Sequence, residues 1–276
     1  MQGVTAGSLL IDGHVHLYDC FEMVAALEAA AHNFAAAGAA WNGSRVGVLM
    51  LTETSRDNRF DRLRSADGAG DWRLSGFDED PTALRARRVR DGDELLIVAG
   101  FQVISSEGLE VLTLATSARL ADGKPAREII EEAHAADALL VLPWAVGKWL
   151  GRRGRVLDEL MHESFAAELF LGDNSGRPWF WRNPSHLRAA RRRGMRILPG
   201  TDPLPLPHEV ERIGSFGCAL DASLGDQHPT DDIKRALRDR SIPWRPFGRL
   251  ETSGRFVRNQ IGLRTGARTS PAAGAS

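Results

Sequence analysis

The sequence predicts an α/β protein built as a (β/α) barrel, and three observations favour this class. Short apolar segments alternate with amphipathic ones along most of the 276 residues, which is typical of strands that alternate with covering helices. Polar side chains that could carry chemistry stand at the carboxyl ends of several of these segments, as they do in barrels. The apolar fraction of 43% is that of an ordinary globular protein with a sizeable core.

Eight apolar segments are expected to be strands. In order along the chain they are residues 8–16, 45–53, 94–103, 109–115, 138–144, 167–172, 196–202 and 218–223. Segments with helical spacing are expected between them, at residues 21–37, 125–136, 155–164, 185–193, 208–213 and 230–240. Pro125 and Pro229 stand at the starts of two of these helices, where the missing N–H leaves no hydrogen bond unmade.

The pattern indicates one domain over residues 1–264. A polar segment at residues 55–93 interrupts it and is expected to be an excursion or a lid over the barrel mouth. Residues 265–276 are small and polar, and we expect them to form a disordered tail.

Charge and hydropathy exclude several kinds of partner. The chain has 35 basic and 36 acidic residues, a net charge of −1, so no overall field attracts nucleic acid or an acidic membrane. No apolar run approaches the roughly 20 residues of a membrane-spanning helix. The first residues lack a signal-peptide pattern, and a cytoplasmic location is expected. The oligomeric state is left open.

The first predicted strand ends in a motif that could bind a metal. Side chains alternate along a strand, so Asp12, His14 and His16 point to one face. Two neutral imidazoles at this spacing can both reach one divalent ion at about 2.0–2.1 Å. A pair of hydrogen-bonded core histidines would give the same pattern. Asp202, which ends the seventh predicted strand, could add a carboxylate, or it could be a turn or helix-cap residue.

Basic and amide groups follow other predicted strands. Lys148 and Arg152 lie in a glycine-rich segment, GKWLGRRGR, that runs into a helix and could bind an anion. Lys148 could there replace the charge of a metal, or it could belong to the solvated start of a helix. Asp173, Asn174 and Arg177 follow the sixth predicted strand and would add polar groups to the barrel mouth.

Together these motifs resemble the PHP (polymerase and histidinol phosphatase) superfamily of metal-dependent phosphoesterases. The likeness covers roughly residues 8–225 and is carried by IDGHVH, VAGFQVISSEGLEVLTLA, DGKPAREIIEEA, VLPW and LPGTDPLP. It implies a distorted TIM-like (β/α)7 barrel close to the amidohydrolases, with a cluster of metal ions at its mouth.

The sequence departs from the family pattern at several metal ligands. Glu53 replaces an aspartate in the Thr-Asp-His motif, and the histidine of that motif is lost. Gln102 replaces a glutamate that bridges two metals, Trp144 replaces a histidine, and Leu204 replaces the final histidine. A neutral amide is a poor bridge between two cations, and an indole has no lone pair for a metal. The resemblance therefore implies one divalent ion, zinc, manganese or iron, or none.

Three functions remain open at this point, of which the last is a protein-interaction role in which residues 55–93 and the tail recruit a partner. The first is a PHP-like metal-dependent hydrolase of a phosphate ester, acting on a small anionic molecule without a nucleic-acid or membrane partner. The second is a degenerate barrel that binds an anionic ligand without metal. For the hydrolase, the expected metal ligands are His14, His16, Asp202 and Glu53; the expected catalytic or anion-binding residues are Lys148, Arg152 and Arg177; and the expected pocket residues are Gln102, Trp144, Asp173 and Asn174.

Overall fold

The computed structural model describes residues 5–39, 45–163, 165, 168–181 and 184–266. The strands are β1 (Thr5–Val15), β2 (Arg45–Leu51), β3 (Gly68–Ala69), β4 (Trp72–Gly76), β5 (Ala83–Arg88), β6 (Glu94–Val98), β7 (Gly100–Ile104), β8 (Glu110–Leu114), β9 (Leu139–Pro143), β10 (Leu169–Asn174), β11 (Ile197–Gly200), β12 (Gly217–Leu224) and β13 (Trp244–Phe247). The helices are α1 (Met23–Gly38), α2 (Arg59–Arg64), α3 (Ala126–Ala135), α4 (Gly151–Leu160), α5 (Ser185–Arg192), α6 (Pro229–Arg238) and α7 (Ser253–Gly266), with short 3-10 helices η2 (Trp179–Trp181) and η3 (Pro207–Arg212).

The described strands form two sheets. One has eight strands in the order β13-β12-β1-β2-β6-β5-β4-β3, and the other has five in the order β11-β10-β9-β8-β7. Strand β12 runs antiparallel to β1, and β8 runs antiparallel to both of its neighbours. A (β/α) barrel is closed by parallel strands. The predicted TIM-like (β/α)7 barrel is therefore wrong for the described residues, which form a mixed α/β structure of two sheets.

The third predicted strand is divided between the two sheets, and this division explains how they meet. Strand β6 belongs to the larger sheet and β7 to the smaller one, with the change at Ala99 and Gly100. A Cβ at Gly100 would lie 2.5 Å from the carbonyl oxygen of Leu51, so only glycine allows this approach. Beyond it, the N–H of Glu53 donates to the Gly100 carbonyl (2.9 Å), and the N–H of Gln102 donates to the Glu53 carbonyl (2.8 Å).

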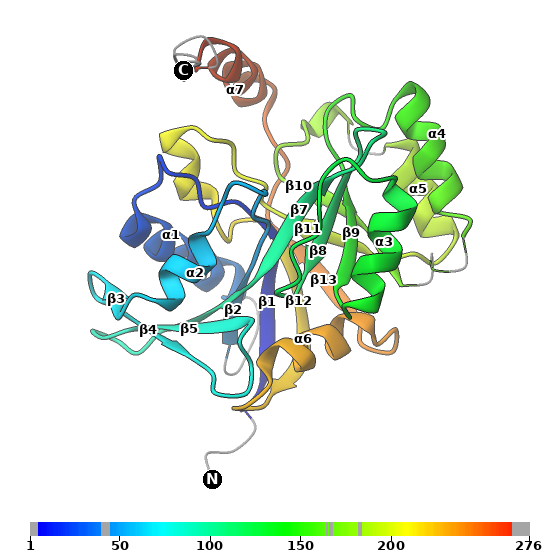
Figure 1. The fold of residues 1–276 in the computed structure, drawn as a ribbon. Helices are drawn as coiled ribbons and strands as arrows, with labels where there is room; N and C mark the ends of the chain where they lie inside the picture. The colour runs from blue at the N-terminus through cyan, green and yellow to red at the C-terminus, as the bar shows by residue number, and fades with distance from the viewer. Residues whose placement is uncertain (1–4, 40–44, 164, 166–167, 182–183, 267–276) are drawn as a thin grey trace, which may run out of the picture.

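Helices cover the outer faces of both sheets (Figure 1). Helix α1 packs on the eight-stranded sheet through Leu27 and Phe34, while α3, α4 and α5 pack on the five-stranded sheet. A third apolar cluster contains residues of both sheets, including Ile11 and Met50 from one and Val141 from the other.

Of the two regions that break the sequence pattern, residues 55–93 are described in full and the tail only in part. Within residues 55–93, strands β3, β4 and β5 extend the larger sheet at its edge, and the Trp72 ring is fully buried. Residues 265 and 266 end helix α7, and the remainder of the expected tail, residues 267–276, lies outside the described residues. None of the described helices is long and apolar enough to cross a membrane.

Candidate metal centre

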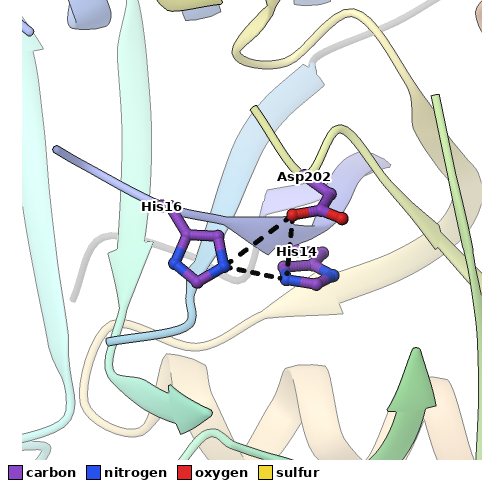
Figure 2. A group of neighbouring side chains, drawn as sticks. All are labelled: His14, His16 and Asp202. Atoms are coloured by element: carbon purple, nitrogen blue, oxygen red, sulfur yellow. Dashed lines mark hydrogen bonds and ion pairs between the residues drawn. The ribbon is translucent and has the colours of Figure 1, made fainter. Parts of the chain in front are cut away.

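His14, His16 and Asp202 converge at one point (Figure 2). The two imidazole Nε2 atoms are 3.1 Å apart, and Oδ1 of Asp202 lies 3.5 Å from Nε2 of His14 and 3.8 Å from Nε2 of His16. Two atoms that bind one zinc ion tetrahedrally are separated by about 3.4 Å. The three separations bracket this value, so the cluster has the dimensions of a ligand set for one metal ion.

The protonation of the cluster also suits a metal. Burial lowers the pKa of His14 and of His16 to about 4, so both rings are neutral at pH 7, the form that ligates metals. Two neutral imidazoles whose Nε2 atoms face each other can share only one hydrogen. An ion between them would use both lone pairs. Burial raises the pKa of Asp202, and His16 and Lys148 lower it.

The Asp202 carboxylate is held in place by its backbone and by Asn174. Asp202 has a φ of +47°, a left-handed conformation that is costly for a residue other than glycine and recurs at functional sites. Its N–H donates to the His14 carbonyl (2.8 Å), and Nδ2 of Asn174 donates to Oδ2 (2.8 Å) and to the Trp144 carbonyl (2.7 Å). Oδ1 of Asn174 is buried without a hydrogen-bond partner among the described residues. The site therefore holds a spare acceptor beside Asp202.

Asp12 holds the backbone next to Asp202 through hydrogen bonds. It is fully buried and accepts hydrogen bonds from the N–H of Thr201 (2.8 Å), the hydroxyl of Thr201 (2.5 Å) and the N–H of Gly214 (2.9 Å). Burial raises its pKa to about 7. A Cβ at Gly200 would lie 2.3 Å from the His14 nitrogen, so glycine allows β11 to approach β1. Sequence analysis placed Asp12 on the face of the histidines but gave it no role.

A cavity of about 320 Å³ opens onto the cluster. Of the residues expected at the site, it is lined by His16, Asp202, Gln102, Trp144, Asn174 and Lys148. It is also lined by residues that sequence analysis missed, which are Tyr18, Glu110, Glu251 and the α7 residues Phe256, Asn259, Gln260 and Leu263. Tyr18 continues the alternation of His14 and His16 and stacks on the His16 ring at 5.3 Å, a signal that was available in the sequence.

Gln102 and Trp144 occupy the neighbourhood of the histidines in different ways. The Gln102 side chain lies close enough to His14 and His16 to raise the pKa of both rings against the effect of burial, and its Nε2 lies 3.4 Å from Oε1 of Glu110. The Trp144 ring is buried, meets the Trp181 ring edge-on at 5.5 Å and belongs to the core beneath α4. Trp144 is thus a wall of the cavity with no metal-binding atom.

Glu53 was expected to be a metal ligand, but its carboxylate contacts Phe60 and Arg119. Its Oε1 accepts from the N–H of Phe60 at the start of α2 (2.5 Å), and its Oε2 accepts from Arg119 (3.1 Å). Each of its oxygens therefore already accepts a hydrogen bond from the α2 segment or from Arg119. Among the described residues, the group whose ligand atoms lie close enough to share one ion consists of His14, His16 and Asp202, and Glu53 is not part of it.

The two arginines expected to bind an anion also lie elsewhere. Arg177 is buried in a two-pronged ion pair with Asp173 (2.7 and 2.6 Å) and donates to the Trp181 carbonyl. Arg152 is exposed in the first turn of α4 and does not line the cavity. Asp173 and Arg177 satisfy each other, which leaves Lys148 as the member of the expected cationic set that faces the cavity.

Sequence comparison identifies no family for the chain. No protein-family model and no curated protein matches it. Among solved structures, that of PsfC from Pseudomonas syringae PB-5123 is similar, with a TM-score of 0.54 at 13% sequence identity over 95% of this chain and 99% of that one. This similarity concerns the fold alone.

Two structures of a lesion-specific endonuclease are similar at a lower level. Endonuclease Q in complex with a 27-mer duplex carrying an abasic lesion gives a TM-score of 0.43, and PfuEndoQ from Pyrococcus furiosus gives 0.47, both at 14% identity over 86% of this chain. The chain spans 57% and 56% of their lengths. The expectation of a small anionic substrate and no nucleic acid is corrected, because its exclusion of nucleic acid rested on the total charge of the chain. A net charge of −1 gave too little ground for excluding nucleic acid, because local charge at a cavity is independent of the total.

Proposed function

We propose that the chain is a metal-dependent hydrolase of phosphate esters that uses one divalent ion, zinc, manganese or iron. The observation that carries the proposal is the convergence of His14, His16 and Asp202 at the separations of a metal-ligand set beside a cavity. The order of motifs that resembles the PHP superfamily supports the same reading. The fold shared with PsfC is compatible with it.

The residues of the chain divide the work of such a reaction. A divalent ion held by His14, His16 and Asp202 would polarise a phosphate ester and make water a stronger nucleophile. His14 and His16 stay neutral and keep their Nε2 lone pairs available, while Asn174 orients the Asp202 carboxylate. Burial and nearby carboxylates raise the pKa of Tyr18, so its hydroxyl keeps its proton and can donate a hydrogen bond to a substrate oxygen. Helix α7 covers one side of the cavity and limits access of bulk water.

The proposal is tested by metal content and hydrolysis measured on the same samples. Protein purified without a nickel resin is analysed for metals, stripped with chelator and assayed with added zinc, manganese or iron. The substrates are a chromogenic phosphodiester, a phosphomonoester and an oligonucleotide duplex with an abasic site. The matched variants are His14→Ala and His134→Ala, because the His134 side chain is 53% exposed on α3 and away from the cavity.

We expect hydrolysis that is lost with chelator and with His14→Ala and is kept in His134→Ala. Below about 0.1 equivalent of bound metal, with no change on His14→Ala, the metal-dependent proposal fails. If phosphate compounds then stabilise the metal-free protein against heat, the alternative of an anion-binding protein without metal replaces it.

A further inference from the structure

Glu110 brings a carboxylate to the cavity that no family motif predicts. In the register of β7 and β8, Gln102 faces Leu112 and Ile104 faces Glu110. Gln102 and Glu110 are therefore diagonal neighbours on one face of the sheet. Oε1 of Glu110 lies 3.4 Å from Nε2 of Gln102. The negative charge of Glu110 raises the pKa of His14 against the larger effect of burial.

Lys148, from the segment after β9, donates from its Nζ to the same Glu110 oxygen. The Glu110 side chain is 13% exposed and that of Lys148 is 37% exposed. Both line the cavity, and the ammonium acts electrostatically on both His14 and Asp202. The other lysines, Lys124 and Lys234, pair with acids away from this cavity.

The Lys148 ammonium has fewer hydrogen-bond partners than the guanidinium of Arg177. Arg177 directs Nε and Nη2 at Asp173 and Nη1 at a carbonyl. An ammonium has three donor hydrogens, and among the described residues Glu110 is the one acceptor that Lys148 meets. Two of its donors therefore remain for a ligand in the cavity.

The carboxylates that line the cavity show how many cations it can take. They are Asp202, Glu110 and Glu251. Glu251 is paired with Arg212, and Glu110 is paired with Lys148. Of these three carboxylates, Asp202 is the one that has no ion pair with a lysine or arginine among the described residues. A second divalent ion would find Glu110 occupied and would meet the charge of Lys148.

We propose that Glu110 is a positioning residue that holds the Lys148 ammonium beside His14 as a built-in cation. The ammonium then binds a phosphate oxygen of the substrate, and the centre takes one divalent ion rather than two. This inference rests on the proposed function, because the role of Lys148 requires a phosphate-ester substrate and a metal ion at His14, His16 and Asp202.

The test compares Glu110→Gln, Lys148→Met, Lys148→Arg and the double variant Glu110→Gln with Lys148→Met. Lys124→Met is the matched control, because Lys124 pairs with Glu132 away from the cavity. Calorimetry gives the number of manganese ions bound and the dissociation constant of inorganic phosphate for the manganese-loaded protein. Kinetics on a phosphodiester gives KM and kcat separately, and thermal melting shows that each variant is folded.

The wild type should bind one ion, and Lys148→Met should weaken phosphate binding and raise KM by about tenfold or more, as expected for a lost charge-assisted hydrogen bond. Glu110→Gln should act in the same direction, the double variant should match Lys148→Met, and Lys148→Arg should restore most of the binding. Lys148→Met should not weaken metal binding, because the variant removes a positive charge that acts on His14 and Asp202 and leaves all three cluster residues in place.

Binding of two ions by the wild type overturns this inference and the single-ion count of the proposed function, but it leaves metal-dependent hydrolysis intact. Phosphate affinities unchanged in Lys148→Met, or additive effects of the two single variants, overturn it as well. Binding of no ion contradicts the proposed function instead, so the two failures are distinguishable.

Discussion

The cavity has two walls that are built differently. The wall of β1 and β11 carries His14, His16 and Asp202. The two imidazoles are buried, and Asp12 holds the neighbouring backbone by accepting hydrogen bonds from Thr201 and Gly214. The wall of β8 and the segment after β9 carries Glu110 and Lys148, and the ammonium is partly exposed on a loop. The first wall presents fixed lone pairs and the second presents an adjustable cation.

This difference indicates which wall is suited to a metal ion and which to a phosphate group. A metal ion needs donors within a few tenths of an ångström of their ideal separations, and only a packed wall provides them. A phosphate group can be met by a flexible side chain that brings donors and charge. If this division is correct, substitutions in the first wall change metal affinity, and those in the second change phosphate affinity.

The largest expected effect is on metal affinity in Asp202→Asn. The change keeps the size of the side chain and tolerates the left-handed backbone, but it removes the unpaired carboxylate of the cluster. We expect metal affinity to fall by more than about 100-fold, because even outer-shell changes cost 10–100-fold. Titration with zinc and manganese measures it, with the exposed Asp226→Asn as control. An unchanged affinity would remove Asp202 from the ligand set.

A smaller effect is expected from Asp12→Asn, which acts through the wall rather than on the ion. The amide cannot accept all of the hydrogen bonds that Thr201 and Gly214 donate to the carboxylate. We expect a loss of metal affinity of about tenfold and a loss of about 1–3 kcal/mol in the free energy of unfolding. Metal titration and urea unfolding of one sample measure both. Wild-type values for both would show that the wall does not depend on Asp12.

Asn174→Ala tests whether the orientation of Asp202 matters by itself. The variant removes the hydrogen bond from Nδ2 to Oδ2 of Asp202 and leaves the three cluster residues present. Metal affinity should fall by a few-fold to about tenfold, measured by competition with a chelator of known affinity. A loss as large as that of Asp202→Asn would indicate that the spare Oδ1 of Asn174 is itself a ligand.

The smallest effect on metal binding is expected for Glu53→Gln. Both oxygens of Glu53 are used by Phe60 and Arg119, so metal affinity should remain within about twofold. The free energy of unfolding should fall by about 1 kcal/mol, seen as a lower urea midpoint. A clear loss of metal affinity would indicate that Glu53 is a metal ligand, as the sequence predicts.

Hydrophobic patterning predicted where nine of the described strands lie, but it missed β3, β4, β5 and β13 and did not predict how the strands run. The eight apolar segments all contain strands, because burial of alternating or continuous apolar residues is a local property. The direction of β12 against β1 depends on where the intervening chain crosses, and no residue of β12 records it. The division of residues 94–103 between two sheets depends on the approach of Gly100 to Leu51, a contact between distant segments.

The site was predictable to the extent that its residues share one strand or one motif. His14 and His16 follow from alternation along β1, and Asp202 follows from its place at the end of β11. Arg177 was assigned to the cavity because sequence does not reveal that Asp173 takes its donors. Helix α7 and Glu110 were missed because they reach the cavity only through tertiary packing.

The measurement that tests the account most directly is a calorimetric titration of metal-stripped protein with zinc and with manganese. The account predicts saturation at one equivalent in the wild type, and loss of that binding in His14→Ala with His134→Ala unaffected. Binding that survives His14→Ala unchanged, or no binding in the wild type, would contradict a metal centre at His14, His16 and Asp202.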